Sequence, residues 1–335
     1  MANRLLTFAR LAFEVAQSVV PDRRHRFAPK RYTQPQLLAC VLVKEYLGLD
    51  YRTAREAIEI SGPIRDAFRL VRVPDHTTLW RFARDGATPD VVAEALAETV
   101  ARLKASGRES GPDPPGGLQL VAIDSTGLPP RRGGRAAGTP RGTSTNAGRR
   151  ALRRPTRRGR TRGGRLPRPW AAALWIGPQL VTAQLSKPGP CGDYPDLPPL
   201  AEASTASVPG AVILADAGYD CESNHVFCRD RLRVGTLIPA KTRRHVAGPR
   251  RPHRAEMVRM LGCATLGVEG RPDAMKTYRQ RWLVETLMSV VKRKWGERLT
   301  ARLPAMQETQ ALLRGLVYNL YRLVVLGVRP TLAGP

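Results

Sequence analysis

The chain has 335 residues, 42% of them hydrophobic, and its 55 Lys and Arg against 28 Asp and Glu give a formal net charge of +27. This length can bury one large core or two smaller ones, so we expect two domains. The apolar content excludes a disordered protein, and the sequence lacks the run of about 18 apolar residues that a membrane span needs. The excess of positive charge favours a polyanionic partner, above all nucleic acid.

Two further features predict a cytoplasmic location, on the nucleoid if the partner is DNA. The five cysteines are scattered and include no CxxC pair, which argues against a disulfide framework. Residues 1–20 interleave apolar and charged side chains and lack the apolar core and cleavage site of a signal peptide.

Short capped helices are predicted for the first third of the chain, after an N-terminal helical arm at 1–32. Thr33 can cap a helix that runs to Gly48, Asp50 can cap the next, and Ser61 opens a third. Asp75 can cap a fourth helix, and residues 33–110 together form the predicted helical domain.

The fourth of these helices carries side chains suited to DNA. Several short helices followed by a polar, basic one are typical of a helix-turn-helix, whose last helix enters the major groove. The alternative is a plain helical bundle with a basic surface. On the first interpretation, the residues that contact DNA are Thr77, Thr78, Trp80 and Arg81.

Residues 131–169 have an unusual composition, with 14 arginines, no lysine and no acidic residue among Gly, Pro, Ala and Thr. Such a segment cannot build a core, so we predict a disordered insert.

Strands and helices alternate on either side of that insert. Residues 118–124 and 211–216 are apolar runs that each end in Asp. The remaining predictions are a hairpin at 170–185 that turns at Gly177-Pro178, a strand at 234–239, and helices at 221–231, 275–295 and 308–326. This alternation predicts an α/β layer domain.

The two strand-terminal acids, Asp124 and Asp216, are candidate metal ligands. If their strands are parallel neighbours, both carboxylates emerge at the same edge of the sheet. Two adjacent carboxylates repel unless a cation lies between them, and Mg²⁺ prefers hard oxygen ligands. The alternative is that each Asp merely caps a turn.

The predicted helix at 275–295 has a polar stripe opposite an apolar arc. With about 100° per residue, the apolar arc faces the sheet. Within the stripe, Glu285 can complete a metal site while Arg281 and Lys292 hold phosphates. The stripe consists of Tyr278, Arg281, Glu285, Ser289 and Lys292.

The spacing Tyr278-x2-Arg281-x3-Glu285-x6-Lys292 resembles the Tyr-Arg-Glu-Lys signature of DDE transposases from bacterial insertion sequences. The sequences around Asp124 (VAIDSTG) and Asp216 (LADAGYD) also resemble that family's settings for its first two acids, and the resemblance covers roughly residues 33–326.

The resemblance implies a ribonuclease H-like catalytic domain at 116–300, followed by a C-terminal helix and tail at 301–335. Asp124, Asp216 and Glu285 would then hold Mg²⁺, or Mn²⁺, for phosphoryl transfer on DNA. Tyr278, Arg281 and Lys292 would bind DNA near the cleaved phosphate. The partners would be the double-stranded terminal repeats and the target, bound by a homodimer.

The arginine-rich insert departs from the family, whose members have strand-forming sequence soon after the first Asp. One explanation is a DNA-binding arm. The other is a frame-shifted stretch, which would leave an inactive enzyme. The function expected is therefore Mg²⁺-dependent cleavage at insertion-sequence ends and strand transfer. The alternative is a decayed or repurposed transposase that only binds DNA.

Overall fold

The computed structural model describes residues 3–23, 27, 31–109, 117–130, 167–189, 192–241, 251–263 and 266–331. Its helical elements, in chain order, are α1 (Arg4–Val19), α2 (Gln34–Leu47), α3 (Tyr51–Ile60), α4 (Gly62–Ala67), α5 (His76–Asp85), α6 (Pro89–Ala105), η2 (Tyr194–Asp196), α7 (Leu197–Ser207), η3 (Ala217–Tyr219), α8 (Glu222–Val226), the π-helix η4 (Phe227–Arg231), α9 (Pro252–Leu261), α10 (Pro272–Arg279), α11 (Trp282–Trp295) and α12 (Pro304–Val325).

Side-chain caps start the N-terminal helices where the sequence predicts them. Thr33 and Gln36 form a reciprocal capping box at α2, and Gly48 ends that helix in the left-handed region at φ 68°. Asp50 and Asp75 accept hydrogen bonds from the first backbone N–H groups of α3 and α5. These local signals are strong because each satisfies donors that a helix start leaves unpaired.

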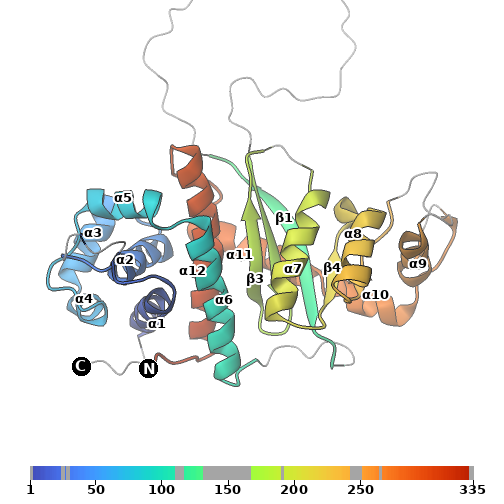
Figure 1. Cartoon of the computed structure of the whole chain (residues 1–335), viewed down its shortest axis with the longest axis horizontal. Coiled ribbons are helices and arrows are strands. Elements are labelled where there is room, and N and C mark those ends of the chain that lie inside the picture. Colours follow the sequence, from blue (N-terminus) through green and yellow to red (C-terminus); the bar gives the residue numbers. More distant parts are fainter. Residues whose placement is uncertain are drawn as a thin grey trace, which may run out of the picture.

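The chain folds into two groups of elements that meet along α12 and α6 (Figure 1). Helices α1 to α5 lie on one side of α12, and the sheet lies on the other. Helix α12 is buried along most of its length, and one continuous set of buried apolar side chains runs from α1 through α12 into the sheet. Helix α1 packs on α2, α6 and α12.

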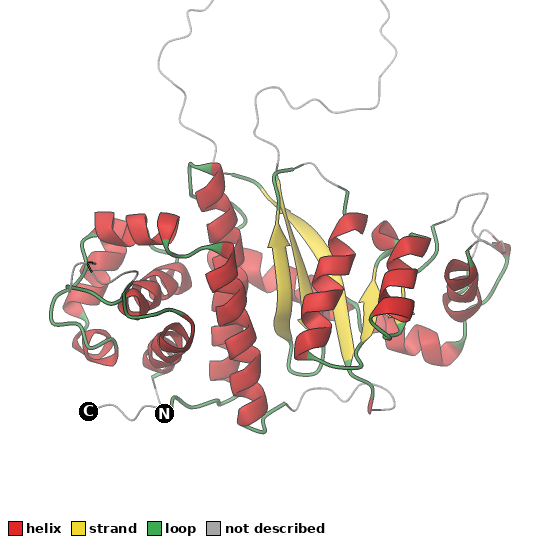
Figure 2. Cartoon of the chain, viewed as in Figure 1, coloured by secondary structure: helices red, strands yellow, loops and turns green. Residues whose placement is uncertain are grey.

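Within the described residues, five strands form one mixed sheet in the order β3-β2-β1-β4-β5, flanked by helices (Figure 2). Strand β1 pairs antiparallel with β2 and parallel with β4, and β5 continues the parallel part. The expected α/β class is therefore confirmed. The bounds are β1 (Leu120–Leu128), β2 (Arg168–Trp175), β3 (Leu180–Ser186), β4 (Val212–Ala215) and β5 (Thr236–Leu237).

The hairpin predicted at 170–185 is present, with residues 176–179 forming its turn. This hairpin completes the antiparallel side of the sheet. Helix α7 packs on β1, β2 and β3, whereas α11 packs on β1 and β2 from behind in the view of Figure 1. Helices α8, α9 and α10 extend the molecule beyond the β5 edge.

The C-terminal boundary predicted for the insert was wrong by two residues. Arg168 and Pro169 begin β2, and Arg168 is buried, where its guanidinium donates to Ser186 and pairs with Glu308 at 2.7 Å. Composition alone counted this arginine as solvated, but a cross-strand serine and a carboxylate on α12 satisfy its donors. Residues 131–166 of the predicted insert lie outside the described residues.

The single helix predicted at 275–295 was also wrong. The structure has two helices, α10 and α11, separated by a turn at Gln280 and Arg281. There the backbone N–H groups of Gln280, Arg281, Leu283 and Val284 donate to carbonyls three residues earlier instead of four. This tighter turn shifts the phase of Tyr278 relative to the residues of α11, so one helical wheel does not describe both segments.

Candidate active site

The first two acids lie side by side at one edge of the sheet. Strands β1 and β4 are parallel, and Ile123 is in register with Ala215, so Asp124 and Asp216 follow at matching positions. The Asp124 carboxylate accepts from the backbone N–H of Ser125 at 2.8 Å, and the Asp216 carboxylate accepts from that of Gly218 at 2.7 Å. Asp216 therefore also caps its own turn, as the alternative interpretation expected. Asp124 does not, and the prediction that it ends its strand was wrong, because β1 continues to Leu128 along β2.

The third acid comes from the helix behind the sheet. Leu283, Val284 and Leu287 bury one side of α11, and Glu285 lies on its exposed side, in the first turn. Arg281, just before the helix, donates to Glu285 at 2.5 Å and lies 3.5 Å from the carboxylate of Asp124. One guanidinium thus joins the acid of α11 to the acid of β1.

Burial and neighbouring charge both act on Asp124. Desolvation raises the pKa of its carboxyl above the ordinary value, and the carboxylates of Asp216 and Glu285 raise it further. The Ser125 N–H and the Arg281 guanidinium act in the opposite direction but do not cancel the effect. The charges of Asp216 and Glu285 therefore both act on the carboxyl of Asp124.

The other two residues of the stripe also face this site. Lys292, half-buried on α11, donates from Nζ to Thr126 Oγ1 on β1 at 2.5 Å. Tyr278, at the end of α10, is half-buried; desolvation raises the pKa of its hydroxyl, while the charge of Arg281 and a hydrogen bond to it lower it. The fold therefore brings Tyr278, Arg281 and Lys292 to the same edge of the sheet as the acids.

A divalent metal matches the chemistry of these donors, because three carboxylates offer only hard oxygen ligands. In the part of the chain that the structure describes, however, no three Asp, Glu, His or Cys side chains converge closely enough to hold one ion. The Arg281 guanidinium lies between two of the carboxylates instead. The three carboxylates are therefore the kind of ligand that a divalent metal prefers, but in this structure the Arg281 guanidinium lies among them.

The four predicted recognition residues lie elsewhere, on α5, across α12 from the sheet (Figure 1). Thr77 and Arg81 are exposed, whereas Thr78 and Trp80 are half-buried. The guanidinium of Arg84 stacks over the Trp80 ring at 4.8 Å. Helix α5 thus presents polar and cationic groups outward while Leu79, Phe82 and Ala83 hold it to the core.

Some residues next to the acids were not predicted as part of the site. The hydroxyl of Ser125 donates to Asp193 at 2.7 Å, and Lys241 Nζ donates to the Gly218 carbonyl at 3.1 Å. In the sequence, Asp193 stands in a proline-rich loop and Lys241 follows a short strand, so nothing local distinguishes them. Only the long-range packing places them beside Asp124 and Asp216.

A mixed α/β sheet with two acids side by side where the parallel pairing of β1 and β4 ends, and a third acid on a packed helix, defines a class of phosphoryl-transfer enzymes on the ribonuclease H-like fold. The family model described as the transposase DDE domain matches residues 115–320. The chain belongs to this transposase family, whose members catalyse phosphoryl transfer on DNA.

Three solved structures are similar to this chain at low identity. A Mos1 transposase paired-end complex with left transposon end is 15% identical, covering 93% of this chain and 82% of that chain, with a TM-score of 0.24. A pre-cleavage Mos1 transpososome is 14% identical over 96% of both chains, with a TM-score of 0.21. The Mos1 mariner paired end complex with Mn is 14% identical, covering 93% and 83%, with a TM-score of 0.22.

Among curated proteins, no sequence matches this chain. In the described part of the chain, no helix is both long and apolar enough to cross a membrane.

Proposed function

We propose that this transposase cleaves DNA at the ends of an insertion sequence and joins those ends to target DNA, with Asp124, Asp216 and Glu285 as its catalytic acids. The observation that supports this proposal is the register of β1 and β4, which sets two carboxylates at one sheet edge, next to Arg281 and Glu285.

The three carboxylates would hold Mg²⁺, or Mn²⁺ in its place. Bound there, the metal would supply Lewis-acid activation of the attacking hydroxyl and stabilise the leaving oxygen. The chain's own contribution is position and charge. The hydrogen bonds that Asp124 and Asp216 accept from neighbouring backbone N–H groups fix two of the carboxylates before DNA arrives.

The cations around the acids would hold the DNA backbone at the reacting phosphate. The guanidinium of Arg281 can form two parallel hydrogen bonds to a phosphate, and Lys292 offers a mobile point charge. Tyr278 would line the same strand. Arg281 and Lys292 also offset the charge that builds up on the phosphate oxygens during in-line attack, and the Tyr278 hydroxyl can donate a hydrogen bond to them.

Sequence recognition would belong to the N-terminal helices. We place the DNA-binding domain at residues 33–110, with Thr77, Thr78, Trp80 and Arg81 in the major groove of the terminal repeats. The catalytic domain would span 116–300. A homodimer on DNA would bring two ends together, and a protein that acts on chromosomal DNA would work on the nucleoid.

The deciding experiment is Mg²⁺-dependent cleavage of a duplex that contains an element end, using the intact chain and its Glu285→Gln variant. We expect the variant to lose cleavage on the order of a thousandfold while it still binds the duplex. Glu297→Gln is the matched control, because Glu297 is an exposed glutamate just beyond the same helix. Equal cleavage by both variants would contradict the assignment.

The alternative, a chain that only binds DNA, was suggested by the arginine-rich insert, which stands where members of the family have strand-forming sequence. Strands β2 and β3 form the antiparallel side of the sheet after that insert, so the insert no longer favours the alternative. Binding without cleavage by the unmodified chain, in either Mg²⁺ or Mn²⁺, would restore it.

A further inference from the structure

From Asp124 onward, strand β1 is held by the sheet on one side only. Its parallel pairing with β4 ends at Ile123, opposite Ala215, whereas its antiparallel pairing with β2 continues to Leu128. The carboxylate of Asp124 accepts from the backbone N–H of Ser125, so the orientation of this acid depends on where the strand lies at Ser125. A contact that fixes Ser125 therefore also acts on the first catalytic acid.

That contact comes from Asp193, in the turn before α7. The Ser125 hydroxyl donates to Asp193 Oδ1 at 2.7 Å, across 68 residues of sequence. Asp193 directly precedes η2, and at the start of a helix an Asp side chain commonly accepts from the first N–H groups. Within the described residues, its carboxylate makes no such cap and contacts β1 instead. The acid therefore connects two distant segments and does not stabilise its own turn.

The contact lies on the face of the sheet opposite the catalytic acid. Because successive side chains of a strand point to opposite faces, Asp124 lies on one face of β1 and Ser125 on the other. Arg281 approaches Asp124 to 3.5 Å from the side of α11. Asp193 holds Ser125 from the other side, where α7 packs on the sheet. This placement makes Asp193 a support of the strand and not a further ligand of the metal.

A buried amide joins the turn of Asp193 to the turn of Asp216. Asn224, on α8, is buried, and its Nδ2 donates to the carbonyls of Tyr194 in η2 and Tyr219 in η3, both at 2.9 Å. Tyr194 directly follows Asp193, and Tyr219 ends the turn that Asp216 caps. One side chain therefore sets the spacing between the support of the first acid and the turn of the second.

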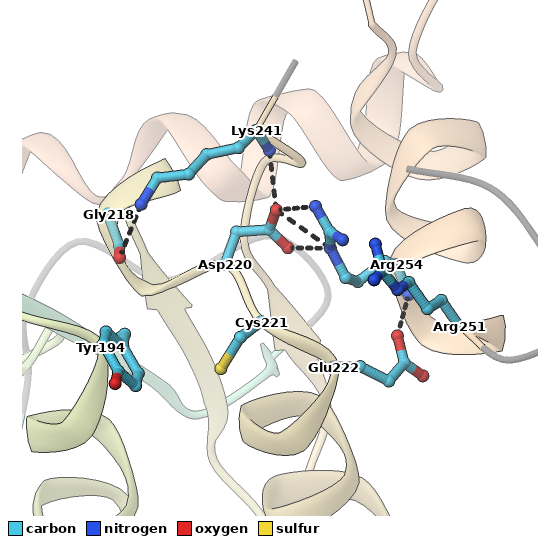
Figure 3. A pocket seen from close by; sticks show the side chains of 8 residues that line it. All are labelled: Tyr194, Gly218, Asp220, Cys221, Glu222, Lys241, Arg251 and Arg254. Atoms are coloured by element: carbon cyan, nitrogen blue, oxygen red, sulfur yellow. Dashed lines mark hydrogen bonds and ion pairs between the residues drawn. The ribbon is translucent and has the colours of Figure 1, made fainter. Parts of the chain in front are cut away.

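Packing between the two turns does not fix that spacing by itself. A cavity of about 480 Å³ opens beside them, and Figure 3 shows Tyr194 from η2 and Gly218 from η3 at its border. Empty space supplies no contacts that could hold the turns on this side. Their positions therefore depend on the Asn224 amide and on the hydrogen bond between Asp193 and Ser125.

The region around this hydrogen bond is shielded from solvent. Tyr219 is 1% exposed, and its hydroxyl oxygen is inaccessible. Burial raises the pKa of this hydroxyl, and the charges of Asp193 and Asp124 raise it further, so the ring ends close to both acids. Water cannot readily replace a hydrogen bond that is lost in such a place, so removing the acceptor of Ser125 leaves the strand without that support.

We propose that Asp193 is a positioning residue for this reaction, acting through Ser125 to hold Asp124 beside Asp216. Its carboxylate serves as a hydrogen-bond acceptor, and neither the metal nor the DNA touches it. The inference rests on the proposed function, because it assumes that the two acids act together on DNA. Removing groups that hold metal ligands in place changes metal affinity or activity by roughly 10- to 100-fold.

Two substitutions of Asp193 separate position from charge. Asp193→Asn removes the charge but keeps an oxygen that can accept from Ser125, whereas Asp193→Ala removes both. Electron paramagnetic resonance measures the Mn²⁺ affinity of the DNA-free chain, and cleavage of a duplex with an element end gives kcat and KM. We expect Asp193→Ala to lower the Mn²⁺ affinity and kcat by about tenfold at an unchanged KM, and Asp193→Asn to keep both within about twofold.

Ser125→Ala tests the route of the effect. Because Asp193 acts through Ser125, the double variant Ser125→Ala, Asp193→Ala should lose no more Mn²⁺ affinity or kcat than either single variant. Glu202→Ala is the matched control and should change neither quantity, since Glu202 is an exposed acid of α7. Urea denaturation shows which variants are folded. If Asp193→Ala is not, Ser125→Ala compared with Asp193→Asn decides the question.

Three results would overturn the inference: equal losses in Asp193→Asn and Asp193→Ala, losses that multiply in the double variant, or unchanged Mn²⁺ affinity and kcat in folded Asp193→Ala. The first would mean that the charge of Asp193 acts directly on the metal or the DNA. A loss of stability alone, as in the third, would mark a purely structural contact. Failure of the proposed function is seen separately, in the unmodified chain, as Mn²⁺ binding without cleavage.

Discussion

Arg281 lies 3.5 Å from the carboxylate of Asp124, although 157 residues separate the two in sequence. The same guanidinium binds Glu285 at 2.5 Å. A cation of the chain therefore lies between two acids that would otherwise repel, in the region where a metal would bring them together. Arg281 and a divalent cation thus compete for the same carboxylates, and a DNA phosphate that takes up Arg281 would favour the metal.

The first prediction follows from this competition. Replacing Arg281 with Met should raise the affinity of the DNA-free chain for Mn²⁺ by about tenfold, because a positive charge within 4 Å of the carboxylates is removed. Titration of free Mn²⁺ by electron paramagnetic resonance measures this affinity. Arg279→Met is the control, since Arg279 is exposed on α10 two residues earlier. An affinity that stays the same or falls would show that Arg281 does not compete with the metal.

Asp220 and Arg254 form a buried ion pair at 2.6 Å, which gives a second prediction. Asp220→Asn removes the charge partner of a buried guanidinium, so the free energy of unfolding should fall by about 3–5 kcal/mol. Asp273→Asn breaks the exposed pair with Arg271 and should change it by less than about 1 kcal/mol. Urea denaturation of the three proteins makes the comparison. Similar losses for the two variants would mean that the buried pair stabilises the fold no more than the exposed pair does.

The same pair predicts how stability depends on pH. Burial opposes ionisation of Asp220, but the nearby His225 imidazole and the hydrogen bonds from Arg254 and the Lys241 backbone outweigh it and lower the pKa of Asp220 to about 2. Because the unfolded carboxyl has a pKa of about 3.9, this contribution is complete above about pH 5 and is lost as the pH falls towards 2. The stability gap between the unmodified chain and Asp220→Asn should therefore narrow below about pH 4. A constant gap across that range would contradict the assignment.

The parts of the fold that were predicted depend on local chemistry. Thr33, Asp50 and Asp75 satisfy helix N–H groups two or three residues away, so their effect can be recognised from the sequence. The acids at Asp124 and Asp216 stand out for a similar reason, because each ends an apolar run of strand length. The pairing of the two runs in the sheet can then be predicted, because the rules for strand connections allow only a few topologies.

The parts that were missed depend on contacts between distant segments. The apolar pattern of residues 275–295 continues through Arg281, so it gives no sign of the break between α10 and α11. At this break, Arg281 contacts Asp124 and Glu285. Arg168 belongs to β2 because Ser186 and Glu308 satisfy its guanidinium. The walls of the cavity beside Gly218 come from segments that no local pattern connects.

A fourth prediction concerns Asn319, which completes the free edge of β3. Its amide accepts from the Val181 N–H and donates to the Val181 carbonyl, both at 2.8 Å, and donates to Thr99 on α6 as well. Asn319→Leu would leave both backbone groups of Val181 buried without these partners, at a cost of about 2–4 kcal/mol. Urea denaturation measures the loss, and a change within about 0.5 kcal/mol would mean that another group replaces the amide.

The last prediction separates a recognition helix from a plain basic bundle. Arg81 is exposed on α5, whereas Arg84, one turn further on, pairs with Asp85 at 2.7 Å and stacks on Trp80. If α5 lies in the major groove, Arg81→Ala should weaken binding to terminal-repeat DNA more than to random DNA of equal length. Loss of a base contact would cost about 1–3 kcal/mol, and loss of a phosphate contact would lower the salt slope by about one instead.

Anisotropy titrations at several salt concentrations distinguish these outcomes, with Arg84→Ala as the matched control. Because Arg84 already has a carboxylate and a ring as partners, its removal should leave the ratio of specific to random binding nearly unchanged. A ratio that falls with Arg81→Ala alone supports readout of bases by α5. If both variants weaken both DNAs equally, the helix contributes charge but no sequence recognition, and another surface must recognise the terminal repeats.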